Sequence, residues 1–228
     1  MNGKLVVLAA GFMTLHGAVA MVKPLNKPWL ANGETLVCFG DSITAGKDYF
    51  MKPLTAALEA KGVRVVNAGV PGDKTPMALT RIGEIAAMKP DAVMIFFGGN
   101  DSVIGRGRWR DEPKVEPTTF RDNLKWMIHY LRMKAGVKKF SIVAPTGLCE
   151  GEGLAEFGPV CAAYQLAARE AADDMNAVLV PLDHAFEMSF RASVPNEKGF
   201  VLTEDGVHFN DRGSFIAAQA MLDAWNMK

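Results

Sequence analysis

A serine follows the apolar run at residues 35–39, at a point where its hydroxyl group can be exposed. The segment FGDSIT, residues 39–44, places Ser42 directly after that run and close to a glycine. A serine hydroxyl is a weak nucleophile until a base removes its proton, and Asp-Ser pairs are also common in turns. Ser42 is therefore a candidate nucleophile that requires a partner.

A histidine near the C-terminus is the candidate partner. In the segment DGVHFN, residues 205–210, Asp205 precedes His208 by three positions. One turn of backbone lets the Asp205 carboxylate accept a hydrogen bond from the imidazole Nδ1, which leaves Nε2 able to take a proton from Ser42. The pattern predicts a nucleophile, a base and an acid that orients the base.

Two further turns follow strand candidates and contain groups that stabilise negative charge. The segment NAGVPG, residues 67–72, contains Gly69, and the segment GGND, residues 98–101, contains Asn100. Backbone amides in a tight turn and an asparagine amide are donors that stabilise an oxyanion in a transition state. We expect Gly69 and Asn100 to take this role.

The neighbours of these residues and the other histidines have simpler interpretations. Asp41 and Asp101 are expected to fix their turns by hydrogen bonds. His16 falls in the N-terminal segment expected to be a signal peptide, and His129 lies in a helical pattern. His184 is the strongest rival base because it follows a strand, but it lacks the spacing to an acid, and we interpret it as a structural histidine in a loop.

From residue 34 onward, short apolar runs alternate with longer helical patterns, which is typical of a parallel sheet covered by helices on both faces. Each run is nearly unbroken in hydrophobicity, as expected for strands buried on both faces. We expect strands at residues 35–39, 63–67, 92–97, 139–144 and 177–181. We expect helices at residues 50–61, 76–88, 118–135, 159–175 and 212–227. Ligand sites of open α/β sheets lie at the carboxyl ends of the strands.

Two connections, residues 102–117 and 146–158, are longer than a compact α/β unit needs and are candidate substrate-binding loops. The first contains an aromatic and cationic cluster, made of Arg106, Arg108, Trp109 and Arg110. Such a cluster suits a sugar ring or an acidic glycan, and a solvated loop is the alternative.

The four segments together resemble the conserved blocks of the SGNH hydrolase superfamily, also called GDSL esterases and lipases, in the order of that family. The resemblance implies that Ser42 is the catalytic serine and His208 the catalytic histidine. It also implies an oxyanion hole formed by the amides of Ser42 and Gly69 with the side chain of Asn100. The implied fold is a three-layer α/β/α sandwich of the flavodoxin-like SGNH type, with a five-stranded parallel sheet.

The implied activity is hydrolysis of a carboxylic ester through an acyl-serine intermediate, with no metal or organic cofactor. The superfamily includes carbohydrate O-deacetylases, short-chain esterases, lysophospholipases and thioesterases. We expect a small acyl group, such as acetyl, on a carbohydrate. The alternatives are a lysophospholipase or thioesterase, acyl transfer to an alcohol, and a non-catalytic carbohydrate-binding scaffold on the same fold.

The charge composition of the chain indicates which classes of binding partner to expect. Lys and Arg together equal Asp and Glu, at 25 each, so net charge offers no basis for binding nucleic acid or an anionic membrane surface. No spacing of metal-binding residues is present. A small-molecule or glycan ester is therefore the expected partner.

The N-terminus has the order of a secretory signal peptide: Lys4, an apolar run, and the small residues Ala18-Val19-Ala20. The run is short for a membrane span, which needs about 20 apolar residues. We expect a signal peptide at residues 1–20 cleaved after Ala20, a lead-in at 21–33, a hydrolase domain at 34–228, and a secreted or periplasmic product. Translation from Met21, giving a cytoplasmic product, is the alternative.

The three cysteines form no CxxC motif. Cys38 lies in a strand pattern, where a buried inert thiol is expected. Cys149 and Cys161 can pair if the protein reaches an oxidising compartment. Because the sequence does not give their separation, a disulfide and two thiols both remain open.

Overall fold

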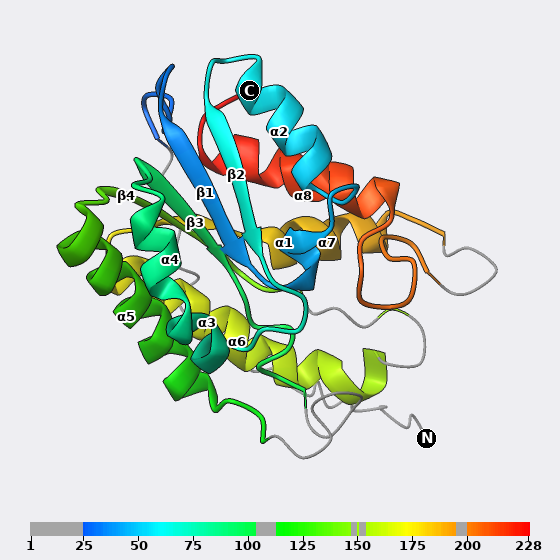
Figure 1. Cartoon of the computed structure of the whole chain (residues 1–228). Helices are drawn as coiled ribbons and strands as arrows, with labels where there is room; N and C mark the ends of the chain where they lie inside the picture. The colour runs from blue at the N-terminus through cyan, green and yellow to red at the C-terminus, as the bar shows by residue number, and fades with distance from the viewer. Residues whose placement is uncertain (1–24, 104–112, 147–149, 151–153, 195–199) are drawn as a thin grey trace, which may run out of the picture.

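The computed structural model describes residues 25–103, 113–146, 150, 154–194 and 200–228, with only the backbone for residues 154–160. Figure 1 shows a central sheet with helices on both of its faces. All five strands are parallel and lie in the order β2-β1-β3-β4-β5. The strands are β1 (Thr35–Gly40), β2 (Arg64–Gly69), β3 (Ala92–Phe96), β4 (Lys139–Val143) and β5 (Val178–Val180). The predicted fold class is confirmed.

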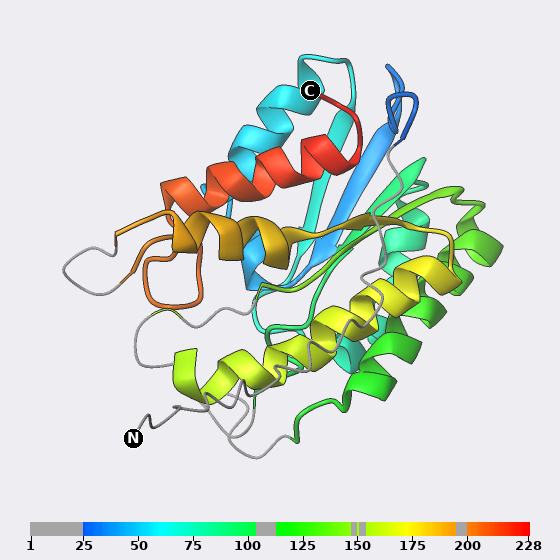
Figure 2. The ribbon, with the colours of Figure 1, turned by 180° about the vertical axis from the view of Figure 1, so that it is seen from behind.

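The helices form two layers, which Figures 1 and 2 show from opposite sides. One layer consists of α2 (Met51–Glu59), α7 (Leu182–Arg191) and α8 (Asp211–Ala224). The other consists of α3 (Thr75–Thr80), α4 (Ile82–Ala87), α5 (Pro117–Ala135) and α6 (Leu154–Asp174). A one-turn helix, α1 (Ser42–Ala45), follows β1 directly.

The central strands contribute side chains to both hydrophobic clusters. In β1, Leu36 and Cys38 face the layer of α2 and α8, whereas Val37 and Phe39 face the layer of α5 and α6. All four side chains are fully buried. Burial on both faces explains the unbroken apolar runs of the sequence. Burial also raises the pKa of the Cys38 thiol to about 12, which keeps it protonated and unreactive, as predicted.

Two helical predictions are wrong. The helix expected at 76–88 is divided into α3 and α4 at Arg81, whose side chain turns toward the sheet. The segment after β5 is helix α7 and not a loop, so His184 lies on a helix, where it is exposed. Leu182 and Phe186 are buried at four-residue spacing on that helix, and this spacing is visible in the sequence.

Several predictions fall outside the described residues. These are the signal peptide at residues 1–20 with His16, the loop cluster at 106–110, and Cys149 of the possible disulfide. Cys161, the other cysteine of that possible disulfide, is buried in α6. Among the residues that the structure describes, no helix is long and apolar enough to cross a membrane.

A buried hydrogen bond between the sheet and α8 leads to the first prediction. The Trp225 indole Nε1 donates to Ser141 Oγ at 2.9 Å, and both side chains are fully buried. Replacing Ser141 with alanine leaves this indole N–H unpaired. We expect Ser141→Ala to lower the free energy of unfolding by about 1–3 kcal/mol, measured by urea denaturation.

Ser214 provides the matched control for this variant. Its hydroxyl is buried and has no hydrogen-bond partner among the described residues. Ser214→Ala should therefore change the free energy of unfolding little. Equal losses in the two variants would show that the bond to Trp225 is not the cause.

Candidate active site

Ser42 is the first residue of α1, at the carboxyl end of β1. Asp41 caps this helix, since its Oδ1 accepts a hydrogen bond from the Ile43 amide at 3.0 Å. The cap holds the chain in the sharp turn between strand and helix, which is the role predicted for Asp41. As a first-turn amide, the Ser42 N–H has no carbonyl acceptor within its own helix.

Glycines at two strand ends allow α1 to pack directly on the sheet. A Cβ at Gly40 would lie 2.1 Å from Thr44 Oγ1 and 2.7 Å from the carbonyl oxygen of Phe96. A Cβ at Gly69 would lie 2.3 Å from the amide nitrogen of Ala45. Only glycine permits such close backbone approach. The two glycines therefore set the position of the helix that begins with Ser42.

The structure brings Ser42, His208 and Asp205 together, as the sequence predicted. His208 Nε2 lies 3.1 Å from Ser42 Oγ, although 166 positions separate the two residues. On the other side of the ring, His208 Nδ1 lies 2.8 Å from Asp205 Oδ2. Both distances are within hydrogen-bonding range, so the three side chains form one continuous chain of contacts.

Asp205 is held as an ionised carboxylate. Its other oxygen, Oδ1, accepts the backbone amides of Val207 at 2.9 Å and His208 at 2.7 Å. Burial alone would raise the Asp205 pKa, but the hydrogen bonds from the His208 ring and the two amides together lower it below its usual value. An ionised Asp205 keeps the proton of the imidazole on Nδ1, so Nε2 can accept the proton of Ser42.

An aromatic ring that the sequence reasoning missed lies against His208. The Tyr49 and His208 rings are stacked, with centroids 5.8 Å apart and planes at 26°. A Cβ at Gly46 would lie 2.0 Å from Tyr49 Cδ2, so the tyrosine ring packs on the backbone of Gly46. Burial, with smaller effects from the carboxylates of Glu204 and Asp205, raises the Tyr49 pKa. The ring stays neutral and limits the rotation of the imidazole.

Asn100 lies at the end of β3, beside Asp41. Its Nδ2 donates to the carbonyl oxygen of Asp73 at 3.0 Å and to Asp41 Oδ2 at 3.3 Å. The bond to Asp41 is long, and the hydrogen that makes it can therefore bind another acceptor. The bond to Asp73 meanwhile keeps the side chain in place.

Gly69 is arranged differently from the expectation. Its amide donates to Asn67 Oδ1 at 2.9 Å, and Asn67 Nδ2 donates to the carbonyl oxygen of Thr44 at 2.7 Å. Asn67 therefore links the end of β2 to α1. The Gly69 amide would have to release Asn67 before it could bind a substrate oxygen. The steric contact with Ala45 accounts for a glycine at this position.

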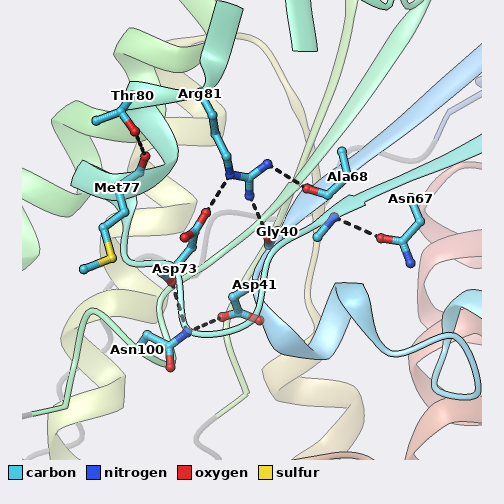
Figure 3. A network of polar contacts seen from close by, with 10 residues as sticks. Gly40, Asp41, Asn67, Ala68, Asp73, Met77, Thr80, Arg81 and Asn100 are labelled. Atoms are coloured by element: carbon cyan, nitrogen blue, oxygen red, sulfur yellow. Dashed lines mark hydrogen bonds and ion pairs between the residues drawn. The ribbon is translucent and has the colours of Figure 1, made fainter. Parts of the chain in front are cut away.

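Arg81 joins the ends of β1 and β2, as Figure 3 shows. Its guanidinium donates to the carbonyl oxygens of Gly40 at 3.0 Å and Ala68 at 2.9 Å. It also binds the Asp73 carboxylate at 2.6 Å and lies over the Phe39 ring. The Gly40 carbonyl oxygen also accepts the Val70 amide at 3.0 Å, so Arg81 is its second donor. The sequence reasoning missed both Arg81 and Asp73.

Two buried aspartates lie behind the site. Burial raises the pKa of Asp41 to about 7 and that of Asp101 to about 6. Asp101 Oδ1 accepts the amide and the hydroxyl of Thr75, which ties the turn after β3 to the start of α3. Asp101 was expected to brace the turn, and it does so by binding a neighbouring element.

The structure describes two other histidines besides His208. His129 lies on α5 and His184 on α7, and both are exposed. The described residues contain no group of three or more His, Cys, Asp or Glu side chains arranged to hold a metal ion.

The fold and these side chains define a class: a three-layer α/β protein with serine, histidine and aspartate joined at the carboxyl end of a parallel sheet. Residues 38–214 match the model of the GDSL-like lipase/acylhydrolase family. The chain belongs to this family and is a carboxylic ester hydrolase.

Solved structures are similar over most of the chain. LAE5, an α/β hydrolase enzyme from the metagenome of Lake Arreo, Spain, is 23% identical, with a TM-score of 0.75, and the match covers 88% of this chain and 99% of that one. Axe2, an acetylxylan esterase from Geobacillus stearothermophilus, is 24% identical, with a TM-score of 0.74, covering 88% and 97%. At these identities the likeness shows the fold. A comparison with curated protein sequences finds no significant match.

The raised pKa of Asp41 predicts a dependence of stability on pH. Between its ordinary pKa near 4 and its folded value of about 7, Asp41 keeps a proton in the folded state that it releases on unfolding. Its contribution to stability is therefore complete below pH 4 and is lost as the pH rises through 7. Asp41→Asn should flatten this decline by about 1 kcal/mol per pH unit, measured by urea denaturation from pH 4 to 8.

Asp48→Asn is the control, because the Asp48 side chain is 90% exposed. It should keep the slope of the wild-type protein. A slope in Asp41→Asn equal to that of the wild type would show that Asp41 is ionised in the folded state throughout this range.

Proposed function

We propose that the protein hydrolyses esters through an acyl-serine at Ser42, with His208 as general base and Asp205 as the acid that orients it. One observation carries the proposal: continuous hydrogen bonds run from Ser42 Oγ through the His208 ring to Asp205, at 3.1 and 2.8 Å. A general base must lie within this reach of the proton that it removes.

In the proposed reaction, Ser42 Oγ attacks the ester carbonyl as His208 Nε2 takes its proton. The ionised Asp205 stabilises the imidazolium that forms. Collapse of the tetrahedral intermediate breaks the bond to the alcohol, which receives the proton from Nε2. Water, deprotonated by the same imidazole, then attacks the acyl-serine and releases the carboxylic acid and Ser42.

The amide of Ser42 and Nδ2 of Asn100 are the proposed donors to the oxyanion. The amide is at the first position of α1, and Asn100 can exchange its long 3.3 Å bond to Asp41 for a substrate oxygen. Each well-placed donor contributes on the order of 3 kcal/mol to transition-state stabilisation. Gly69 joins them as a third donor only if its bond to Asn67 is released.

We propose that the substrate carries a short acyl group, such as acetyl, on a carbohydrate. Axe2 is described as an acetylxylan esterase and as an acetyl-xylooligosaccharide esterase, and three of its structures are catalytic mutants in which a serine, an aspartate or a histidine is replaced. In this chain the side chains of His208 and Asp205 are 31% and 54% exposed, which leaves room for a bulky alcohol beside the base. Export of the chain by residues 1–20 is part of the same proposal.

The mechanism is tested with p-nitrophenyl acetate. We expect Ser42→Ala and His208→Ala to lower kcat/KM by about 1,000-fold or more, because each removes a member of the unit that transfers the proton. Mass spectrometry of acid-quenched protein should find the acyl group on the peptide containing Ser42.

His184→Ala replaces an exposed histidine on α7 and should keep the activity of the wild type. Equal rates in the wild type, Ser42→Ala and His208→Ala would rule out the serine mechanism. Such a result would favour a non-catalytic scaffold.

The substrate class is tested with acetylated xylooligosaccharides, p-nitrophenyl esters of increasing chain length, and lysophospholipids. We expect kcat/KM to be highest for acetyl esters and to fall with each added pair of methylenes. Cleavage of long-chain lipids alone would contradict the carbohydrate assignment. Added glycerol or free sugar in the same assay distinguishes transfer to an alcohol from hydrolysis.

A further inference from the structure

The base of the proposed reaction lies on a loop outside the sheet. Thr203 and Phe209 close this loop through an isolated antiparallel bridge, and the Glu204 amide donates to the carbonyl oxygen of His208 at 2.8 Å. The segment that leads into the loop, residues 201–203, is buried but belongs to no strand or helix. Its backbone polar groups therefore need other partners.

Asn210 satisfies the carbonyl groups of this segment. Its side-chain Nδ2 donates to the carbonyl oxygens of Val201 at 3.1 Å and Thr203 at 3.2 Å. Its backbone amide donates to the carbonyl oxygen of Leu202 at 3.0 Å. Its Oδ1 accepts the Gly213 amide and caps α8. The carbonyl side of the segment is thus tied to the start of a helix.

Glu150 satisfies the amides of the same segment. Its carboxylate accepts the amides of Val201 at 3.1 Å, Leu202 at 2.7 Å and Thr203 at 2.8 Å, and it also accepts the Thr203 hydroxyl. The hydroxyl oxygen in turn accepts the amide of Gly206 at 3.1 Å. A chain of hydrogen bonds therefore runs from Glu150 to a residue two positions before His208.

The four donors that converge on Glu150 need an anion. An ionised carboxylate presents only acceptors, whereas a glutamine would place its NH₂ group against backbone N–H groups. Hydrogen bonds to a charged group are also stronger than those between neutral groups. A buried amide that is left without an acceptor destabilises the segment that contains it.

We propose that Glu150 is a positioning residue for His208. This inference rests on the proposed function, because it concerns how the base is held at 3.1 Å from Ser42 Oγ. Glu150 comes seven positions after the end of β4 in the sequence, and its carboxylate holds the segment that leads to the base. It acts through Thr203 and the backbone, without contact to the reacting atoms.

The test compares Glu150→Gln with Glu34→Gln. Glu34 also binds a backbone amide, that of Ala31, and the ammonium of Lys139, but it lies at the amino end of the sheet. We expect Glu150→Gln to lower kcat about 10- to 100-fold with little change in KM, because a base displaced by about 1 Å loses rate and not ground-state binding. Glu34→Gln should lose stability and keep the kcat of the wild type.

A second readout needs no turnover. Proton NMR of the His208–Asp205 hydrogen bond should show its low-field resonance in the wild type and in Glu34→Gln, and a weakened or absent one in Glu150→Gln. Thr203→Val removes only the hydroxyl, which should lower kcat in the same direction, and Thr203→Ser should restore it. If Glu150→Gln does not fold, the comparison of Thr203→Val with Thr203→Ser tests whether this hydrogen-bond chain positions His208.

The outcomes separate the two proposals. Equal activity of the wild type and Ser42→Ala would reject the serine mechanism, and the NMR comparison would still test the role of Glu150. Wild-type kcat and an unchanged resonance in Glu150→Gln, with only a lower free energy of unfolding, would overturn the positioning role.

Discussion

The close packing of α1 on the ends of β1 and β2 is the constraint on which the site depends. It requires the absence of side chains at Gly40 and Gly69, since a Cβ at either would come within 2.3 Å of atoms of α1. Arg81 then joins the two strand ends by donating to the carbonyl oxygens of Gly40 and Ala68. The position of Ser42 is therefore set by the ends of two strands of the sheet and not by a loop.

The two halves of the site are held by different means. Ser42 is fixed by strand ends and backbone contacts, whereas His208 is carried by a loop whose backbone groups are satisfied by the side chains of Asn210 and Glu150. Side-chain hydrogen bonds replace a neighbouring strand there. The distance between Ser42 and His208 therefore depends mainly on the loop that carries His208, because this loop has fewer backbone contacts.

The pKa values of the two carboxyl groups near the serine are shifted in opposite directions. Asp41 is fully buried, which raises its pKa to about 7, whereas Asp205 accepts the His208 ring and two amides, which lower its pKa. Below pH 7, where Asp41 is mostly protonated, it does not oppose negative charge that develops beside Asn100. An ionised Asp205 stabilises positive charge on the imidazole. Two acids whose pKa values are shifted in opposite directions by their surroundings can have different roles in one site.

The sequence predicted the parts of the site that follow strand ends. The five predicted strands begin and end within two residues of the observed bounds. In the central strands β1 and β3, burial on both faces leaves unbroken apolar runs. Carboxyl ends of parallel strands share one edge, so Ser42 and Asn100 were expected near one another, and the spacing of Asp205 and His208 predicted their hydrogen bond.

The supporting residues depend on tertiary contacts that no local pattern encodes. Arg81 breaks a helical pattern because its partners are the carbonyls of Gly40 and Ala68, at the ends of two other elements. Glu150 binds amides more than 50 positions further along the chain. Only α7 had a local signal, the spacing of Leu182 and Phe186. Motifs in the sequence therefore identify the candidate reacting groups, whereas the groups that hold them in place emerge only when distant segments are brought together.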